Sequence, residues 1–147
     1  MNLENSHCQR VTALRTGVDL ASVEAIGDSV QTFGDKFVNR IYTLRESAYC
    51  TSAATNVGAA QRFAARFAAK EAVIKILRPQ AFRPTWTSIE VVRHDGGWCE
   101  ILLAGTAARM AAEAGITEIQ ISMSHEGGMA IATAAAFTAH DDVRTAL

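Results

Sequence analysis

One stretch of the chain, residues 62–75, constrains the fold more than any other and reads RFAARFAAKEAVIK. It is filled with alanine and straight-chain residues and contains neither glycine nor proline, so its intrinsic preference is helical. We therefore predict a long helix over about residues 59–77. Pro79 helps to end this helix, because a proline cannot continue the hydrogen-bond pattern.

One face of this predicted helix changes from apolar to charged along its length. Side chains four residues apart on a helix point the same way, and this face carries Phe63, Phe67, Glu71 and Lys75. A carboxylate that follows a buried aromatic row is partly desolvated, and it then needs a cation, a metal or a raised pKa. The alternative is that Glu71 and Lys75 form an ordinary solvated ion pair at the favourable spacing.

The composition is that of a globular protein with a single core. Of the 147 residues, 49% are hydrophobic and 20% are charged, which is typical of soluble domains. The net charge of -1 argues against a nucleic-acid-binding protein that relies on a large basic face. No apolar run is long enough to span a membrane and the N-terminus has no signal-peptide pattern, so we expect a cytoplasmic protein.

The cysteines and histidines show no metal-binding spacing. Cys8, Cys50 and Cys99 are widely separated and form no CxxC pair, so we expect reduced, unreactive thiols. His125 precedes Glu126, but the second histidine of a zinc-binding helix does not follow. A zinc site is therefore not expected.

The segments before the central helix predict a strand and a series of short helices. Loose alternation indicates the strand, and N-cap and capping-box patterns indicate where helices begin. The elements are a strand over residues 11–20 ending near Asp19, a helix capped by Ser22 and ending near Gly34, a short helix over 35–41, and another opened by Thr43 with Glu46. Asn56-Val57-Gly58 is expected to interrupt the chain before the central helix.

The segments after the central helix predict two strand pairs and one more helix. They are strands over residues 87–93 and 98–103, a helix over 106–114, and strands over 116–124 and 129–136. Glycine-containing turns join the strands of each pair, as in hairpins. We therefore predict a single α+β domain in which a long central helix packs on an antiparallel sheet. We expect residues 1–10 to be a flexible N-terminal extension, 11–140 the domain, and 141–147 a tail.

Three separated segments together resemble a known enzyme family. They are GVDLASVEAI at 17–26, RFAAKEAVIK at 66–75 and SMSHE at 122–126. In order and spacing they are similar to the Gly-x-Asp, Phe/Trp-Ala-x-Lys-Glu-Ala-x-x-Lys and Ser-x-Ser-His segments of the holo-acyl-carrier-protein synthase family of 4'-phosphopantetheinyl transferases. The resemblance covers residues 12 to about 137. It implies the fold of that family and transfer of the 4'-phosphopantetheine arm of coenzyme A to a serine of an apo acyl-carrier protein.

The resemblance supplies two carboxylates as ligands for a magnesium ion, Asp19 at a strand end and Glu71 on the central helix. Mg²⁺ takes one or two carboxylates, and water and phosphate oxygens complete its octahedral shell. Glu71 could also orient a water as the base towards the carrier serine. Lys75 would stabilise the pyrophosphate and the leaving adenosine 3',5'-bisphosphate. Without metal, we expect the two carboxylates to repel each other.

Further positions match residues near coenzyme A in this family: Arg66, Lys70, Lys75, Ser124 and His125. From their spacing alone, Arg66 and Lys70 form a cationic strip that suits phosphates, or equally two ordinary solvated charges. A lone histidine at a strand end is more often structural, so the resemblance alone assigns His125 to a site.

Other positions depart from the family pattern, mainly where the enzyme would meet its carrier. Ala25 stands where the family usually has an arginine that contacts the acidic helix of the carrier protein. Arg40 matches a second basic position and is expected to dock the carrier together with Arg45. The chain after Lys75 reads ILRPQAF in place of a Gly-Thr-Gly loop. These departures suggest a carrier of specialised synthesis, such as polyketide synthesis, rather than a typical carrier of fatty acid biosynthesis.

The resemblance also implies a homotrimer with a coenzyme A site at each subunit boundary. We expect the apolar strands at residues 119–123 and 130–136 to supply the contacts. Two other functions remain open: a non-catalytic module that binds coenzyme A or a carrier, and a plain structural trimer. The presence of Asp19, Glu71 and Lys75 favours catalysis over both. Neither a nucleic acid nor a membrane is expected as a partner.

Overall fold

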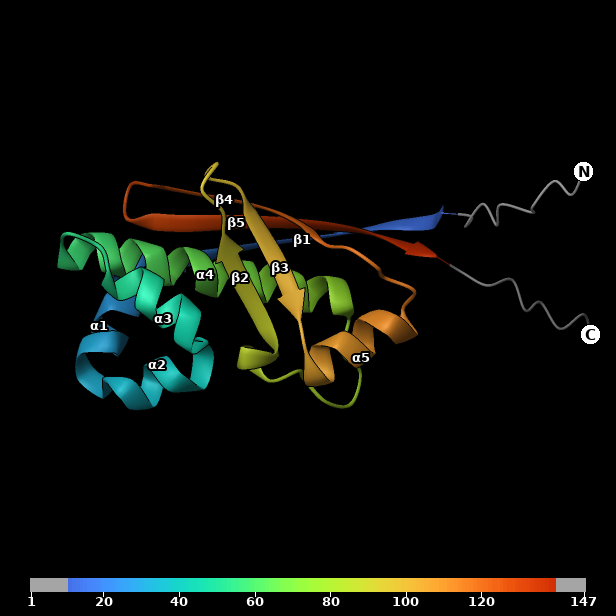
Figure 1. Ribbon diagram of the computed structural model, residues 1–147, viewed down its shortest axis with the longest axis horizontal. Helices are drawn as coiled ribbons and strands as arrows, with labels where there is room; N and C mark the ends of the chain where they lie inside the picture. Colours follow the sequence, from blue (N-terminus) through green and yellow to red (C-terminus); the bar gives the residue numbers. More distant parts are fainter. Residues whose placement is uncertain (1–10, 140–147) are drawn as a thin grey trace, which may run out of the picture.

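Figure 1 shows the computed structural model, which describes residues 11–139. The long helix α4 (Asn56–Leu77) lies along one face of an antiparallel sheet with the strand order β1-β5-β4. The sheet strands are β1 (Val11–Ser22), β4 (Gln120–Glu126) and β5 (Met129–Ala139). The predicted α+β domain with a long central helix on an antiparallel sheet is thus confirmed. The extension predicted at residues 1–10 and the tail at 141–147 lie outside the described residues.

Shorter elements surround the two ends of α4 (Figure 1). One end is covered by α1 (Val23–Phe33), α2 (Asp35–Ile41) and α3 (Leu44–Thr51), and α5 (Gly105–Glu113) lies near the other. A separate hairpin of β2 (Ile89–Arg93) and β3 (Cys99–Leu103) crosses α4, preceded by a short 3-10 turn, η1 (Trp86–Ser88). The predicted hairpins around Asp95-Gly96-Gly97 and Gly127-Gly128 are both confirmed.

Small side chains let α4 pack closely against the sheet. Ala64, Ala68 and Ala72 of α4 are fully buried, and alternate alanines of β5 are buried opposite them. At one position only glycine fits, because a Cβ on Gly17 of β1 would lie 2.1 Å from the carbonyl oxygen of Ala72. This close approach brings β1 against the middle of α4 and fixes the positions of the side chains beside Gly17.

Side-chain caps begin three of the five helices in residues 11–139, and the sequence patterns predict two of these caps. The Ser22 hydroxyl accepts a hydrogen bond from the Ala25 amide, and Thr43 and Glu46 form a complete capping box. The interruption predicted at residues 56–58 is wrong. Helix α4 begins there, because the Thr55 hydroxyl accepts a hydrogen bond from the Gly58 amide and caps the helix.

All five strands differ by a few residues from their predicted ranges, β1 and β4 among them. Strand β1 continues three residues past Asp19, to Ser22, because it stays paired with β5 up to Met129. Strand β4 starts later than predicted, at Gln120. The earlier residue Ile116 makes only an isolated bridge, with Thr138, because Gly115 before it has a φ of 65° and turns the chain.

The face of the sheet that points away from α4 is exposed, and along β1 and β5 it is largely apolar. It presents Leu14, Val18, Leu20, Ile131 and Phe137, with Thr16 and Thr133 among them. Exposed apolar side chains that gather on one face of a protein commonly mark an interface with another chain. Among residues 11–139, no helix has both the length and the apolar character that a membrane span requires.

Candidate active site

Strand β1 and helix α4 place Asp19 beside Lys75. The odd-numbered residues 15–21 of β1 face α4, and the close packing at Gly17 brings this face onto the helix. The Lys75 ammonium donates to Oδ1 of Asp19 at 2.8 Å and to the Val18 carbonyl oxygen at 2.6 Å. The Lys75 side chain remains 50% exposed and that of Asp19 20%, so both groups can be reached from solvent.

Glu71 lies one turn before Lys75 on α4 and pairs with Arg83, a residue that no sequence pattern indicated. Nη2 of Arg83 lies 3.3 Å from Oε1 and 3.2 Å from Oε2 of Glu71. The Glu71–Lys75 pair that the spacing allowed is therefore not formed, because each of the two residues has a partner from another segment. Asp19 and Glu71, which we expect to repel each other without metal, are each paired with a cation of their own.

The chemistry of these two carboxylates fits a magnesium ion. Asp19 and Glu71 offer hard oxygen ligands, and Mg²⁺ is commonly held by one or two carboxylates. Both positions already attract a cationic side chain, so they favour positive charge. No group of three or more potential metal ligands is found in residues 11–139. A magnesium ion at Asp19 and Glu71 would therefore need further oxygens from water or from a phosphate.

A cavity of about 670 Å³ lies between α3, the first half of α4, the β2–β3 hairpin and β4. Three of the predicted residues, Arg66, Ser124 and His125, line it together. Two further arginines, Arg62 and Arg93, also line it, and none of its lining residues is acidic. Such a cavity favours an anion with several negative charges. The spacing of Arg62 and Arg66, one turn apart on α4, could have indicated the first of these arginines, whereas Arg93 gave no signal.

Arg66 is the most buried cation of this cavity. Its guanidinium lies 4.2 Å from the centroid of the Tyr49 ring, and its residue is only 3% exposed. Nη1 makes a long hydrogen bond of 3.4 Å to the Arg62 carbonyl oxygen, and the buried Nε has no hydrogen-bond partner within residues 11–139. A buried guanidinium with unused donors is suited to receive the oxygens of an anion.

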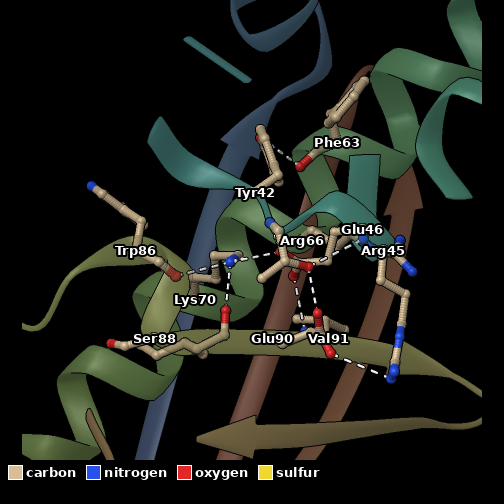
Figure 2. A network of polar contacts seen from close by, with 12 residues as sticks. Tyr42, Arg45, Glu46, Phe63, Arg66, Lys70, Trp86, Ser88, Glu90 and Val91 are labelled. Atoms are coloured by element: carbon tan, nitrogen blue, oxygen red, sulfur yellow. Dashed lines mark hydrogen bonds and ion pairs between the residues drawn. The ribbon is translucent and has the colours of Figure 1, made fainter. Parts of the chain in front are cut away.

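Lys70 does not line this cavity. Its ammonium is fully buried and donates to Oε2 of Glu46 at 2.8 Å, and to the carbonyl oxygens of Trp86 at 2.9 Å and Ile89 at 2.5 Å (Figure 2). Lys70 therefore does not form part of a cationic strip that could bind phosphates, as its spacing from Arg66 had suggested. The alternative, that Lys70 is an ordinary solvated charge, is also wrong. All three ammonium donors are used inside the protein, so we leave Lys70 out of the proposed coenzyme A contacts.

The partner of Lys70, Glu46, is equally enclosed. Its Oε1 accepts a hydrogen bond from the Val91 amide at 2.9 Å, and its Oε2 accepts one from the Thr43 amide at 2.8 Å (Figure 2). Burial lowers the pKa of Lys70, and the Glu46 carboxylate opposes this shift. The pair therefore connects α3, α4 and β2, and it fixes the helix turn that precedes Glu71.

The residues predicted to meet a carrier lie on the surface. Ala25 of α1 and Arg40 of α2 are exposed, and the last turn of α1 carries no basic residue. Arg45 is held 3.4 Å from Oε1 of Glu90, with 64% of its side chain exposed. Carrier docking by Arg40 and Arg45 remains a prediction.

Comparison with known proteins identifies the class to which this fold and these residues belong. Residues 15–134 match the model of the 4'-phosphopantetheinyl transferase superfamily. A holo-[acyl-carrier-protein] synthase of Koribacter versatilis is 42% identical over 121 residues, which cover 82% of this chain and 94% of that protein. One of Desulforudis audaxviator is 40% identical over 123 residues, covering 84% and 92% respectively.

Solved structures give the same result. The coenzyme A complex of the Chronobacterium ammoniagenes synthase superposes with a TM-score of 0.76 at 25% identity, covering 88% of this chain and all of that one. The Helicobacter pylori synthase, also solved with coenzyme A, gives a TM-score of 0.69 at 25% identity and covers 83% and 99%. The chain therefore belongs to the holo-[acyl-carrier-protein] synthase family of the 4'-phosphopantetheinyl transferase superfamily, as the three sequence segments predicted.

Proposed function

We propose that this protein transfers the 4'-phosphopantetheine arm of coenzyme A to a serine of an apo acyl-carrier protein. The observation that carries this proposal is the contact between Asp19 of β1 and Lys75 of α4, with Glu71 one turn before Lys75 on the same helix. Two carboxylates and a lysine of this kind suit a reaction on a charged diphosphate. Relatives named as synthases, and neighbours solved with coenzyme A, support the same reaction.

In this reaction the serine Oγ forms a bond to the phosphorus that carries the pantetheine arm. The bond from that phosphorus to the bridging oxygen of the diphosphate breaks, and adenosine 3',5'-bisphosphate leaves with the bonding electrons. Glu71 would accept the serine proton, directly or through a water. The Lys75 ammonium would balance the negative charge that develops on the leaving oxygen. Asp19 and Glu71 would hold Mg²⁺, which when bound supplies charge neutralisation on the diphosphate.

We propose that the cationic cavity binds further phosphates of coenzyme A. Arg66 supports this role because its guanidinium has an unused buried donor, and Arg62 and Arg93 add positive charge at the same cavity. Ser124 and His125 add a hydroxyl and an imidazole at the end of β4. A trimer would allow this cavity and the Asp19–Glu71 pair to belong to different chains around one coenzyme A.

The exposed sheet face supports assembly as a homotrimer. Most outward side chains of β1 and β5 are apolar, including Leu14, Val18 and Phe137, although Thr16 and Thr133 lie on the same face. The predicted segment 130–136 contributes only through its outward residues, because its even-numbered alanines are buried beneath α4. Strand β1, which the sequence did not indicate for this role, supplies more of the exposed apolar surface. Sedimentation should give a trimer, and a fully active monomer at working concentration would contradict this proposal.

A specialised carrier is the proposed partner, because Ala25 replaces the family's docking arginine and leaves Arg40 and Arg45 as the basic candidates. A screen of apo carriers from fatty acid and polyketide synthesis would identify it. We predict that this reaction takes place in the cytoplasm.

Intact-mass analysis of an apo carrier tests the transferase function. We expect the carrier mass to increase by one phosphopantetheine arm in the presence of enzyme, coenzyme A and Mg²⁺, and not after chelation of the metal. Arg109→Gln, which changes an exposed charge on α5 away from the site residues, is the matched control and should transfer normally. Binding of coenzyme A without a mass increase on any carrier would favour the non-catalytic binding module instead.

A further inference from the structure

Within residues 11–139, the proposed metal carboxylates are paired with Lys75 of α4 and with Arg83, which comes from outside β1 and α4. It lies in the segment 78–85, between α4 and η1. Its Nη2 is 3.2 and 3.3 Å from the two Glu71 oxygens, while 63% of its side chain is exposed. Glu71 itself is only 18% exposed. The guanidinium therefore covers a largely enclosed carboxylate from the solvent side.

Arg83 is held more loosely than Lys75, the other cation of this site. Lys75 has two acceptors, the Asp19 carboxylate and the Val18 carbonyl. Among residues 11–139, the Glu71 carboxylate is the acceptor found for Arg83. Breaking this one half-exposed pair costs little, because ion pairs near the surface contribute little to stability. Arg83 can therefore leave Glu71 without disturbing the fold.

We infer that Arg83 is a built-in counter-ion of the metal site that exchanges its partner during substrate binding. Without a divalent cation, the guanidinium neutralises Glu71. When a divalent cation takes the Glu71 oxygens, the guanidinium is displaced and binds the diphosphate of coenzyme A. This inference rests on the proposed function, since it concerns the same metal and the same diphosphate.

Charge and hydrogen-bond geometry support this exchange. A divalent cation and a guanidinium cannot share the two Glu71 oxygens without strong like-charge repulsion. The freed guanidinium keeps its planar set of N–H donors, which match phosphate oxygens in a two-point contact. The metal also needs oxygens beyond those of Asp19 and Glu71, and the diphosphate of coenzyme A would supply them. That diphosphate would therefore lie next to the guanidinium of Arg83, which is displaced from Glu71.

A coupling between two ligands follows from this exchange. Without coenzyme A, Arg83 competes with the metal and weakens its binding. With coenzyme A, the guanidinium has another acceptor and the competition is relieved. Metal and coenzyme A therefore bind cooperatively, and each strengthens the other by the same factor.

Titration of Mn²⁺, followed by the electron paramagnetic resonance signal of the free ion, tests this inference on the full-length protein. For Arg83→Gln without coenzyme A we expect the Kd for Mn²⁺ to fall roughly two- to fivefold, which corresponds to the loss of one competing surface ion pair. Arg78→Gln is the matched control. It removes an exposed arginine of the same segment for which no ion pair is found in residues 11–139, and it should leave the Kd unchanged.

A second titration in the presence of coenzyme A measures the coupling. The unaltered protein should bind Mn²⁺ more tightly with coenzyme A than without it, and Arg83→Gln should show a smaller gain. Arg83→Lys keeps the charge but not the planar donors, so it should retain weak Mn²⁺ binding while losing part of the gain. An unchanged or raised Kd in Arg83→Gln without coenzyme A would overturn the inference alone. An unaltered protein that binds no Mn²⁺ under either condition would overturn the proposed metal site as well.

Discussion

The Lys75 ammonium and the Asp19 carboxylate lie 2.8 Å apart and join the central helix to the first strand. The same ammonium also binds the carbonyl oxygen of Val18, so it is fixed from two sides of the strand. Lys75, whose proposed role is to balance phosphate charge, is thereby oriented before substrate arrives. This orientation lowers the entropic cost of ordering its side chain on binding. Asp19 accordingly has two roles, as a proposed metal ligand and as the group that positions Lys75.

Removal of either proposed metal ligand should stop transfer without unfolding the protein. We expect Asp19→Ala and Glu71→Gln each to abolish phosphopantetheine transfer in the intact-mass assay. Each change breaks one partly exposed ion pair, so the free energy of unfolding should fall by only about 0–1 kcal/mol in urea denaturation. Normal transfer rates in Glu71→Gln would show that this carboxylate has no part in the reaction.

Gly17 is predicted to be essential for both packing and activity. A methyl group there would overlap the Ala72 carbonyl oxygen at 2.1 Å, so Gly17→Ala must push β1 away from α4. We expect the free energy of unfolding to fall by about 1–3 kcal/mol, as for other overpacked positions, and transfer to fall because Asp19 moves relative to Lys75. Thr16→Ala, on the exposed face of the same strand, is the control and should change little. Equal behaviour of the two variants would contradict the packing argument.

The buried pair of Lys70 and Glu46 should be far more costly to break than an exposed one. Lys70→Met leaves the Glu46 carboxylate buried without its cation, so we expect a loss of about 3–5 kcal/mol in the free energy of unfolding. The double change with Glu46→Gln should lose less than the sum of the single changes. Arg45→Met, which breaks the exposed pair with Glu90, should cost less than about 1 kcal/mol. Additive losses in the double variant would mean that the two charges do not stabilise each other.

The buried thiol of Cys50 predicts a dependence of stability on pH. Burial raises the pKa of Cys50 from 9.0 to about 12, so the folded state keeps a proton that the unfolded state loses. This contribution is fully present below pH 9 and is lost as the pH rises towards 12, at up to about 1.4 kcal/mol per pH unit. Urea denaturation between pH 8 and about 10.5 should therefore show a steeper decline for the unaltered protein than for Cys50→Ala. Burial also raises the pKa of Tyr42, and this main cause is present in both proteins.

The surface of α1 predicts which carriers the enzyme uses. Ala25→Arg restores a cation on an exposed face, so we expect it to lower the KM for a typical acidic carrier by about tenfold, the effect of one charge-assisted contact. The gain should fade at high salt because exposed charges are screened. If the substitution changes nothing, and the unaltered enzyme already modifies that carrier efficiently, the docking prediction is wrong while the transferase function stands.

The sequence predicts the fold well because its signals are local. The N-cap of Ser22 and the capping box of Thr43 with Glu46 each involve residues within one turn, and the structure contains both. Glycine turns between alternating strands predict the hairpins for the same reason. The start of α4 was missed because Gly58 suggested a break, whereas the hydroxyl of Thr55 caps the helix across it.

The site is predicted less completely because its partners are distant in sequence. The resemblance indicated Asp19, Glu71 and Lys75, but the cation that pairs with Glu71 comes from an irregular segment with no periodicity. The burial of Lys70 could not be predicted from its helix alone. Its acceptors belong to α3, η1 and β2, and only the folded chain brings them together.

The three acceptors of Lys70 also bear on when helix α4 can complete its packing during synthesis of the chain. Glu46 is made before α4, but Trp86 and Ile89 are made after it. A nascent chain that ends just after Leu77 therefore lacks two of the groups that satisfy the buried ammonium. The Lys70 ammonium can therefore reach its full set of acceptors only after residues 86–89 have been synthesised, and the turn of α4 before Glu71 is fixed no earlier.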